Sequence, residues 1–393
     1  MKICFITNDI FSNGGIQRVV SVLASELSKN NIVDVICLDK KTKVNRSIYN
    51  LNRNVSIYVD KNELCKNIFE KLYSKIIRII NQKTNLLRNE KLVNWLTRAY
   101  FCESLQKKFI NYLNNKKYDV VIGVSGDYSL LLSIIAKQIE AKTIGWQHNS
   151  YESYFKSKYK YYWNQDKLFK KYMENLNEYI VLTDSDKRSV DNNFNINSHR
   201  IYNPVSFKSS TKSLCEEKVI LFVGRLVEYQ KGIDLLIEAF NKIHEKCDGW
   251  VLKIIGDGPD KNKIINRILK LDLSNKIIVE QFTSSVEKYY SNASMFVSSS
   301  RWEGFGLVVV EAMECGLPVV AFNNSGPREI IGKNGINGIL VPKNDIDQLS
   351  YTILMLINNC TKRKRISKNA IERAKDFEIG KIVLEWENII KKI

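Results

Sequence analysis

The chain has 393 residues, which exceeds one ordinary compact core and suits two domains. Its 44% hydrophobic and 10% aromatic residues exclude a disordered protein, and its net charge of +18 indicates an anionic partner or surface. No apolar run approaches the roughly 18 residues of a membrane-spanning helix, the first residues lack the apolar core of a secretory signal, and the eight cysteines form no Cys-x-x-Cys pair. We therefore expect a cytoplasmic protein with reduced thiols.

The first half of the chain alternates short apolar runs with helical patterns. Buried strands are predicted at Lys2–Thr7, Val33–Leu38, Val55–Val59, Asp119–Val124, Lys142–Trp146 and Tyr179–Thr183. A helix is predicted to begin near Ile16, because apolar residues then recur at three- and four-residue spacing. Strands separated by helices pair in parallel, so an α/β layer architecture is expected.

The same alternation restarts in the second half. Further strands are predicted at Lys218–Val223, Val251–Ile255, Lys276–Val279, Met295–Val297, Pro318–Phe322 and Gly338–Val341. Asn203-Pro204-Val205 and the polar residues 208–217 separate the two series with linker composition. We predict doubly wound domains over residues 1–203 and 204–375, facing across a cleft, and a final helix within 376–393 that returns to the first domain. Ligands of such sheets bind at the carboxyl ends of the strands.

The segment from Ser300 to Glu311 carries the strongest chemical signal. A strand ends just before it and a helix is predicted from Leu307, so Gly304 and Gly306 fall where free backbone N–H groups favour a phosphate or a sugar. Two carboxylates bracket the glycines, and a carboxylate can accept hydrogen bonds from a pair of vicinal hydroxyls. We predict a donor-binding loop made of Glu303, Gly304, Phe305, Gly306, Leu307 and Glu311. The alternative is two solvated glutamates at a helix start.

A second constellation follows the first strand of the second domain. Gly224 and Arg225 end that strand, and Lys231-Gly232 opens the next helix. A guanidinium and an ammonium at one sheet edge suit a diphosphate, although isolated loop cations are often only solvated. Residues 256–259 read Gly-Asp-Gly-Pro, for which an ordinary turn is the stronger interpretation.

In the first domain two loops are candidates. Gly14 and Gly15 join the first strand to the first helix, but without a complete phosphate-binding glycine motif. His148 follows a strand, which makes it the acid, base or orienting candidate of this domain. Two Asp-x-Asp triplets, residues 184–186 and 345–347, precede helical patterns, so helix capping is favoured over metal binding.

Taken together, these motifs resemble the signature of family 4 retaining glycosyltransferases. The resemblance extends over nearly the whole chain and includes residues 299–320, the motifs above and Gly326-Pro327-Arg328-Glu329-Ile330. It implies the GT-B fold of two Rossmann-like domains. It also implies transfer of a hexose or N-acetylhexosamine from a nucleotide sugar, UDP-linked by family frequency, with retention of configuration and without a required metal or other cofactor.

The resemblance also assigns roles on the donor side. It implies that Arg225 and Lys231 hold the donor diphosphate and neutralise the leaving group. Glu303 would bind hydroxyls of the transferred sugar, and Glu311 the ribose.

On the acceptor side the resemblance implies that His148 lies beside the transferred sugar. The Gly14-Gly15 loop would approach donor and acceptor. The resemblance is weakest in the first domain, at Asn149-Ser150 and in a long basic stretch, which leaves the acceptor open.

That basic stretch, residues 61–117, holds 13 Lys/Arg against 4 Asp/Glu. Within it, residues 66–80 predict an amphipathic helix with Lys71, Lys75 and Arg78 on one face, as in helices that lie on anionic bilayers. Its predicted apolar face consists of Ile68, Phe69, Leu72, Tyr73, Ile76, Ile77 and Ile80. Packing of this helix on its own domain is the alternative. Residues 151–172 interleave nine aromatics with six lysines, which also suits a membrane interface.

We therefore expect an enzyme of bacterial surface polysaccharide or glycoconjugate synthesis. It would act peripherally at the inner face of the cell membrane on a saccharide or polyprenyl-linked acceptor, without a nucleic-acid partner. A nucleotide-sugar epimerase of the same fold and a basic nucleic-acid-binding protein are the alternatives.

Overall fold

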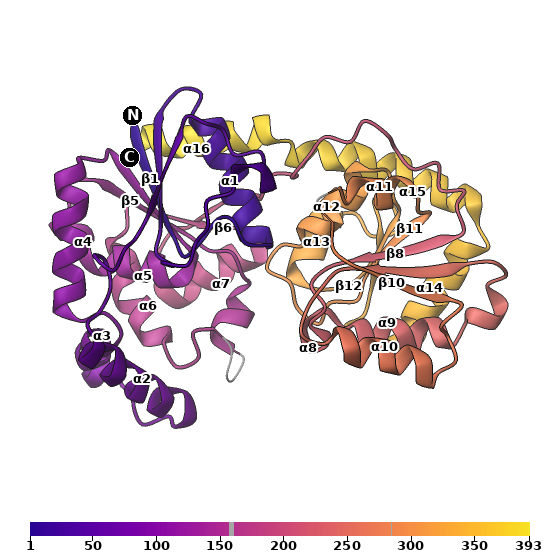
Figure 1. Cartoon of the computed structure of the whole chain (residues 1–393), viewed down its shortest axis with the longest axis horizontal. Helices are drawn as coiled ribbons and strands as arrows, with labels where there is room; N and C mark the ends of the chain where they lie inside the picture. Colours follow the sequence, from indigo (N-terminus) through magenta and orange to yellow (C-terminus); the bar gives the residue numbers. More distant parts are fainter. Residues whose placement is uncertain (157–160, 284) are drawn as a thin grey trace. The chain divides into compact units, whose positions relative to one another are not determined.

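The computed structural model describes residues 1–156, 161–283 and 285–393. The chain divides into two compact units, of which unit 1 combines Met1–Pro204 with Ile379–Ile393 and unit 2 is Val205–Glu378. Each unit is a parallel sheet with helices on both faces (Figure 1). Among the described residues, no helix is long and apolar enough to cross a membrane.

The described part of unit 1 forms a seven-stranded sheet in the order β3-β2-β1-β4-β5-β6-β7. Its strands are β1 (Lys2–Thr7), β2 (Ile32–Cys37), β3 (Val55–Val59), β4 (Val120–Val124), β5 (Lys142–Trp146), β6 (Glu178–Val181) and β7 (His199–Arg200). Its α-helices are α1 (Gly15–Leu27), α2 (Ile68–Lys83), α3 (Val93–Tyr100), α4 (Glu103–Lys116), α5 (Ser125–Ile135), α6 (Asp166–Tyr172), α7 (Asp184–Phe194) and α16 (Ile379–Lys392). The final helix packs against α1, so both ends of the chain belong to one unit.

Unit 2 has a six-stranded sheet in the order β10-β9-β8-β11-β12-β13. Its strands are β8 (Val219–Val223), β9 (Val251–Ile255), β10 (Ile277–Glu280), β11 (Met295–Ser298), β12 (Val319–Phe322) and β13 (Ile339–Val341). Its helices are α8 (Glu228–Lys231), α9 (Ile233–Asn241), α10 (Lys261–Lys270), α11 (Glu287–Ser291), α12 (Leu307–Glu314), α13 (Ser325–Ile331), α14 (Ile346–Ile357) and α15 (Cys360–Ala374). Helices α9, α10 and α14 pack together on one face, and α11, α12, α13 and α15 on the other.

The predicted strands are confirmed within two residues at each end, because strands buried on both faces read as β-branched apolar runs. The two-residue strand β7 was not predicted, since His199 and Arg200 are polar and half-exposed. The capping prediction is right for Asp345, whose carboxylate accepts from the Gln348 N–H. It is wrong for the first triplet, where Thr183 caps α7 and its hydroxyl oxygen accepts from the Asp186 N–H.

The prediction of an aromatic membrane interface over residues 151–172 is also wrong for most of its side chains. Five of its aromatic side chains are buried in the unit 1 core: Tyr151, Tyr154, Phe155, Tyr162 and Phe169. Their rings pack on one another at centroid distances of about 5 to 6 Å. Residues 157–160 of this stretch lie outside the described residues. The aromatics therefore stabilise the domain, as large apolar side chains usually do.

In unit 2, one glycine lets two loops meet. Gly232 has φ +60°, and a Cβ there would lie 2.0 Å from the Ser299 carbonyl oxygen. Any side chain would strain the backbone and push apart the turn after β8 and the loop after β11.

We expect Gly232→Ala to lower the free energy of unfolding by at least about 2 kcal/mol, from left-handed backbone strain plus overpacking. Urea unfolding followed by circular dichroism measures the loss. Gly380→Ala is the matched control, because Gly380 is helical and nothing lies within 4 Å of its Cβ position. Alanine there should be neutral or slightly stabilising. Equal stability of the two variants would contradict the contact.

Candidate functional site

The candidate site of unit 2 lies where the strand order changes direction. Strand β8 has β9 on one side and β11 on the other, with Ile220 paired to Met295. The chain winds outward in both directions from this pair, and ligands of open parallel sheets bind at the point where the strand order reverses. The first loop carries Arg225 and Lys231, and the second carries Glu303.

An ion pair joins these two loops. The Lys231 ammonium contacts Glu303 Oε1, and the Ser300 hydroxyl donates to the same oxygen at 2.7 Å. Both charged side chains are largely buried, at 16% and 9% exposed. Glu303 Oε2 accepts no hydrogen bond from the described residues, so one carboxylate oxygen remains for a ligand hydroxyl.

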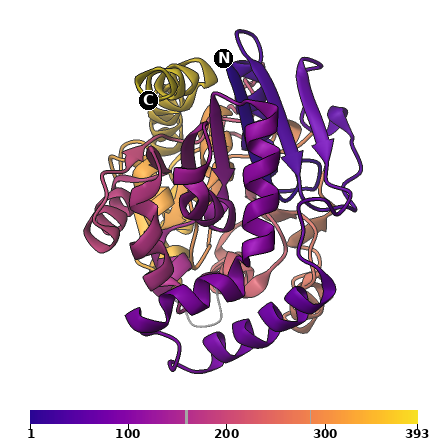
Figure 2. The ribbon, with the colours of Figure 1, turned by 90° about the vertical axis from the view of Figure 1, so that its left-hand side faces the viewer.

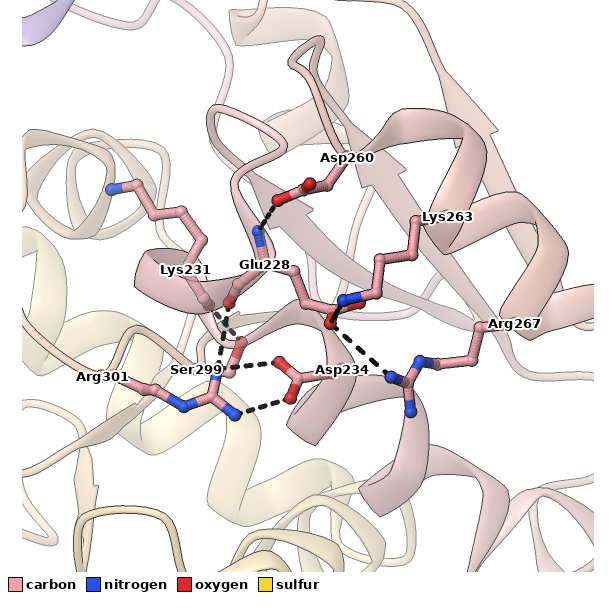
Figure 3. A network of polar contacts seen from close by, with 8 residues as sticks. All are labelled: Glu228, Lys231, Asp234, Asp260, Lys263, Arg267, Ser299 and Arg301. Carbon is pink, nitrogen blue, oxygen red and sulfur yellow. Dashed lines mark hydrogen bonds and ion pairs between the residues drawn. The ribbon is translucent and has the colours of Figure 1, made fainter.

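Arg301 fixes the position of the turn that carries Lys231. The Arg301 guanidinium donates to both oxygens of Asp234, at 2.9 and 2.6 Å, and to the Glu228 carbonyl oxygen at 3.0 Å. Its backbone N–H donates to the Gln230 carbonyl oxygen at 2.9 Å. In Figure 3 the Lys231 side chain points away from the Arg301–Asp234 pair. Arg301 thus fixes the turn and leaves the Lys231 ammonium directed elsewhere.

The other side of the same turn is also fixed. The buried Glu228 carboxylate pairs with Lys263 at 2.6 Å and with Arg267 at 3.6 Å. The Glu228 backbone N–H donates to the Asp260 carboxylate at 2.8 Å (Figure 3). The Ser299 hydroxyl donates to the Lys231 carbonyl oxygen at 3.0 Å. Sequence reasoning missed this network, because its members are far apart in sequence. Only the adjacency of Arg301 to Glu303 could have indicated it.

Unlike the Lys231 side chain, the Arg225 side chain holds no other part of the described structure in place. Its side chain is exposed, and within the described residues it makes no ion pair or side-chain hydrogen bond. Gly224 lies next to it, with its Cβ position 3.9 Å from Lys231 Cδ. The three residues therefore lie at one edge of the sheet, and diphosphate binding there stays a prediction.

The loop before α12 places its glycines as the sequence predicts. Gly306 is the residue before the helix and has φ +103°, a conformation that a side chain would strain. No side chain caps this helix start, and the Val309 N–H donates to the Gly306 carbonyl oxygen at 2.8 Å. The N–H groups of Leu307 and Val308 keep hydrogen-bonding capacity within the described residues. Gly304 and Phe305 are buried, and Leu307 begins the helix half-exposed.

Glu311 is 1% exposed, and its carboxylate already has partners. The Ser206 hydroxyl donates to Oε1 at 2.8 Å and the Tyr290 hydroxyl to Oε2 at 3.1 Å. These contacts tie α12 to the start of unit 2 and to α11. A carboxylate has further lone pairs, so ribose binding stays a prediction beside this structural role.

The Gly-Asp-Gly-Pro loop is explained by packing alone. A Cβ at Gly256 would lie 2.0 Å from the Gly224 carbonyl oxygen, and one at Gly258 would lie 2.5 Å from that of Leu226. The Leu226 N–H donates to the Asp257 carbonyl oxygen at 2.8 Å. This loop supports the Arg225 turn from behind, which agrees with the prediction of an ordinary turn.

In unit 1, His148 follows β5 and is buried. Its ring packs on Trp146 at a centroid distance of 4.3 Å, and neither ring nitrogen has a hydrogen-bond partner in the described part of the chain. Burial lowers the pKa of His148 to about 3, so the imidazole is neutral at physiological pH. The backbone N–H of His148 donates to the Tyr154 hydroxyl oxygen at 3.5 Å, a neighbour that the sequence did not indicate. A neutral ring suits orientation of a ligand better than acid or base catalysis.

The Gly14-Gly15 loop is pinned at both ends. Asp9 accepts from the backbone N–H groups of Phe11 at 3.0 Å and Ser12 at 2.8 Å. Burial alone would raise the pKa of Asp9, but the Ser12 hydroxyl and these backbone N–H groups, which hydrogen-bond to its carboxylate, lower the pKa below its usual value. The Tyr49 hydroxyl accepts from the Gly14 N–H at 3.1 Å. Gly14 has an extended backbone and its Cβ would meet only the flexible Gln17 side chain, so the fold itself does not require glycine there.

Among the described residues, no group of three or more His, Cys, Asp or Glu side chains could hold a metal ion.

Comparison with known proteins identifies relatives of this chain. Residues 206–373 match the family described as glycosyl transferases group 1. An uncharacterized glycosyltransferase of Methanocaldococcus jannaschii is 30% identical over 386 residues, which cover 82% of this chain and 94% of that protein. The poly(ribitol-phosphate) alpha-N-acetylglucosaminyltransferase of Staphylococcus aureus is 29% identical over 350 residues, covering 84% of this chain and 67% of that enzyme.

The fold has solved counterparts. Anabaena HepE, crystallised in complex with UDP and glucose, has a TM-score of 0.74 and 17% sequence identity, and the match covers 100% of both chains. This likeness confirms the predicted fold class. The chain belongs to the glycosyl transferases group 1 family, and it is a retaining glycosyltransferase with the GT-B fold.

Proposed function

We propose that the protein transfers a hexose or N-acetylhexosamine from a UDP-linked sugar to a saccharide acceptor. The observation that carries this proposal is the Lys231–Glu303 pair at the strand-order switch of unit 2, with exposed Arg225 beside it. A cation pair suits a diphosphate, and a carboxylate with one unengaged oxygen suits sugar hydroxyls. The UDP and glucose complex of the HepE structure supports the same donor class.

On this proposal each donor group has a separate task. Arg225 supplies a planar fork of N–H donors to the diphosphate, and Lys231 adds a compact charge. The ammonium has three N–H donors, so it can contact Glu303 and a phosphate oxygen together. Glu303 Oε2 accepts from hydroxyls of the transferred sugar, and Glu311 from the ribose. The N–H groups of Gly304 to Leu307 face the anionic ligand at the helix start.

The transfer itself is a front-face substitution. An acceptor hydroxyl oxygen forms a bond to the anomeric carbon while the bond from that carbon to the β-phosphate oxygen breaks. The electron pair leaves with UDP, and the acceptor proton passes to the departing phosphate oxygen. Arg225 and Lys231 stabilise the charge that develops on that leaving group. His148, which burial keeps neutral, would orient the sugar through one hydrogen bond.

We propose that the acceptor is a saccharide or polyprenyl-linked saccharide and that the enzyme works at the inner face of a bacterial membrane. The Staphylococcus aureus relative is named for a poly(ribitol-phosphate) acceptor, a surface polymer, which supports the acceptor class. The net charge of +18 favours an anionic surface or polymer. Unit 1 would handle the acceptor and unit 2 the donor.

The direct test is a mass-spectrometric screen of UDP-sugars, run with and without a saccharide or polyprenyl-linked acceptor. We expect UDP release that increases when the correct acceptor is present. Conversion of the donor into an epimer without any acceptor would instead identify an epimerase and overturn the proposal.

Arg225→Ala is the cleanest variant for the donor site, because this side chain supports nothing else in the fold. We expect kcat/KM for the UDP-sugar to fall about 10- to 100-fold, the worth of charge-assisted hydrogen bonds, with unchanged urea unfolding. Arg365→Ala is the matched control, since Arg365 is also an exposed arginine of unit 2. Equal kinetics of the two variants would exclude Arg225 from the site.

Glu303→Gln keeps the shape of the side chain but removes its charge. We expect kcat to fall at least about 100-fold, as when a preorganised electrostatic group is lost from an active site. Circular dichroism checks that the variant is folded. Retention of full activity in a folded variant would refute the role of Glu303.

The pH dependence of the unfolding free energy tests whether His148 is neutral in the folded protein. The unfolded imidazole binds a proton below about pH 6.5, whereas the folded one stays neutral until about pH 3. Acid therefore favours the unfolded state, and His148 should cost about 2 kcal/mol of unfolding free energy between pH 7 and pH 5. The difference between wild type and His148→Asn in urea unfolding should change by that amount. A difference that is constant with pH would show that the ring is not buried as a neutral group.

A further inference from the structure

Helix α2 packs with its polar side inward. Its buried residues are Ser74, Ile77 and Asn81. Its large apolar side chains face solvent instead: Ile68, Phe69, Leu72, Tyr73, Ile76, Ile79 and Ile80 are 37% to 84% exposed. An ordinary surface helix shows the opposite arrangement. The sequence prediction placed Ile77 on the same face as the others, but the structure separates it from them.

Buried hydrogen bonds hold this orientation. The Ser74 hydroxyl donates to the Ala99 carbonyl oxygen at 2.5 Å and accepts from the Lys66 ammonium at 2.6 Å. The Asn81 side-chain amide donates to the backbone carbonyl oxygen of Asn164 at 3.3 Å. In return, the Asn164 side-chain amide donates to the backbone carbonyl oxygen of Asn81 at 2.8 Å. Rotation of the helix to hide its apolar side chains would leave these buried polar groups without partners, which is costly. The outward apolar face is therefore built into the packing.

The exposed side chains form one continuous stripe. At about 100° per residue, the seven apolar side chains fall within an arc of about 140°. The same geometry places Lys71 and Lys75 along one border of this arc, and both are exposed. Arg78 is turned further away and lies over the Tyr100 ring at 5.0 Å. Of the three cations that the sequence analysis assigned to the basic face, two therefore border the apolar stripe directly.

The stripe extends beyond α2. Trp95 of α3 contacts Tyr73 edge-on at a centroid distance of 6.4 Å and is 37% exposed. Helices α2 and α3 lie at the margin of unit 1, away from its sheet, as Figures 1 and 2 show. A contiguous exposed apolar patch of this kind indicates a surface that something covers.

The charges select the partner. Residues 61–117 carry 13 Lys/Arg against 4 Asp/Glu, so two copies of this face would bring like charges together. An anionic bilayer instead attracts the border lysines and accepts the apolar side chains. We propose that the α2 face lies in the headgroup region of an anionic phospholipid bilayer, with the apolar stripe inserted and with Lys71 and Lys75 on lipid phosphates. This inference rests on the proposed function at a membrane, and it identifies α2 as the helix that contacts the bilayer.

The test is cosedimentation of the full chain with vesicles of phosphatidylglycerol and phosphatidylcholine, compared with phosphatidylcholine alone. We expect binding to the anionic vesicles, and a triple variant Phe69→Gln, Leu72→Gln, Ile76→Gln to bind them at least about tenfold more weakly, because apolar insertion is lost. Lys71→Gln and Lys75→Gln should each cost about fivefold. Leu269→Gln on α10 is the matched control, since Leu269 is 60% exposed and Leu72 is 58% exposed. It should bind like wild type.

Three results would overturn the proposal. They are no binding of wild type to anionic vesicles, undiminished binding of the triple variant, or a lipid-free dimer that the triple variant abolishes while vesicles are not bound. Binding is measured without donor or acceptor, and UDP-sugar turnover is measured without vesicles. Loss of vesicle binding with normal turnover in the triple variant would support the membrane face. A wild type that binds vesicles but turns over no donor would leave the membrane face intact and refute the proposed function.

Discussion

The site of unit 2 depends on one buried ion pair. Lys231 and Glu303 come from loops that follow the neighbouring strands β8 and β11, and their contact joins the two halves of the sheet where its winding reverses. Removing one partner of a buried pair costs about 3–5 kcal/mol, because the other charge is left without compensation. The pair therefore cannot be an incidental surface contact. The fold must hold each side chain in place and still leave its charge available to a ligand.

Rigidity beneath the pair comes from contacts that leave no room for adjustment. The Gly232 turn meets the Ser299 carbonyl oxygen where even a methyl group would not fit, and Arg301 binds the same turn through its side chain and its backbone. Electrostatic catalysis works best when charges are oriented before the substrate arrives, since no reorganisation is then needed. By contrast, Arg225 is bound to nothing in the described structure and can adjust to a ligand. On the proposed function, one fixed and one adaptable cation suit a diphosphate that must enter and leave.

The sequence predicts the strands and the positions of the site loops because both follow local rules. Parallel strands buried on both faces are apolar runs, and ligand loops follow the strand ends. What it could not predict depends on residues distant in sequence. Glu311 receives hydroxyl donors from Ser206 and Tyr290, and the aromatics after Tyr151 turn into the core and do not face a membrane. Helix α2 was predicted with the right amphipathic pattern, but a pattern does not say which face is buried.

Both units use the same physical device for different ends. In unit 2, buried hydrogen bonds of Arg301 fix the turn that presents Lys231. In unit 1, buried hydrogen bonds of Ser74 and Asn81 fix a helix that presents apolar side chains to solvent. Hydrogen bonds are directional and hydrophobic burial is not, so polar contacts can hold an element in an orientation that apolar contacts alone would reverse. The exposed stripe of α2 costs the isolated protein favourable burial, and only a partner that covers the stripe recovers it.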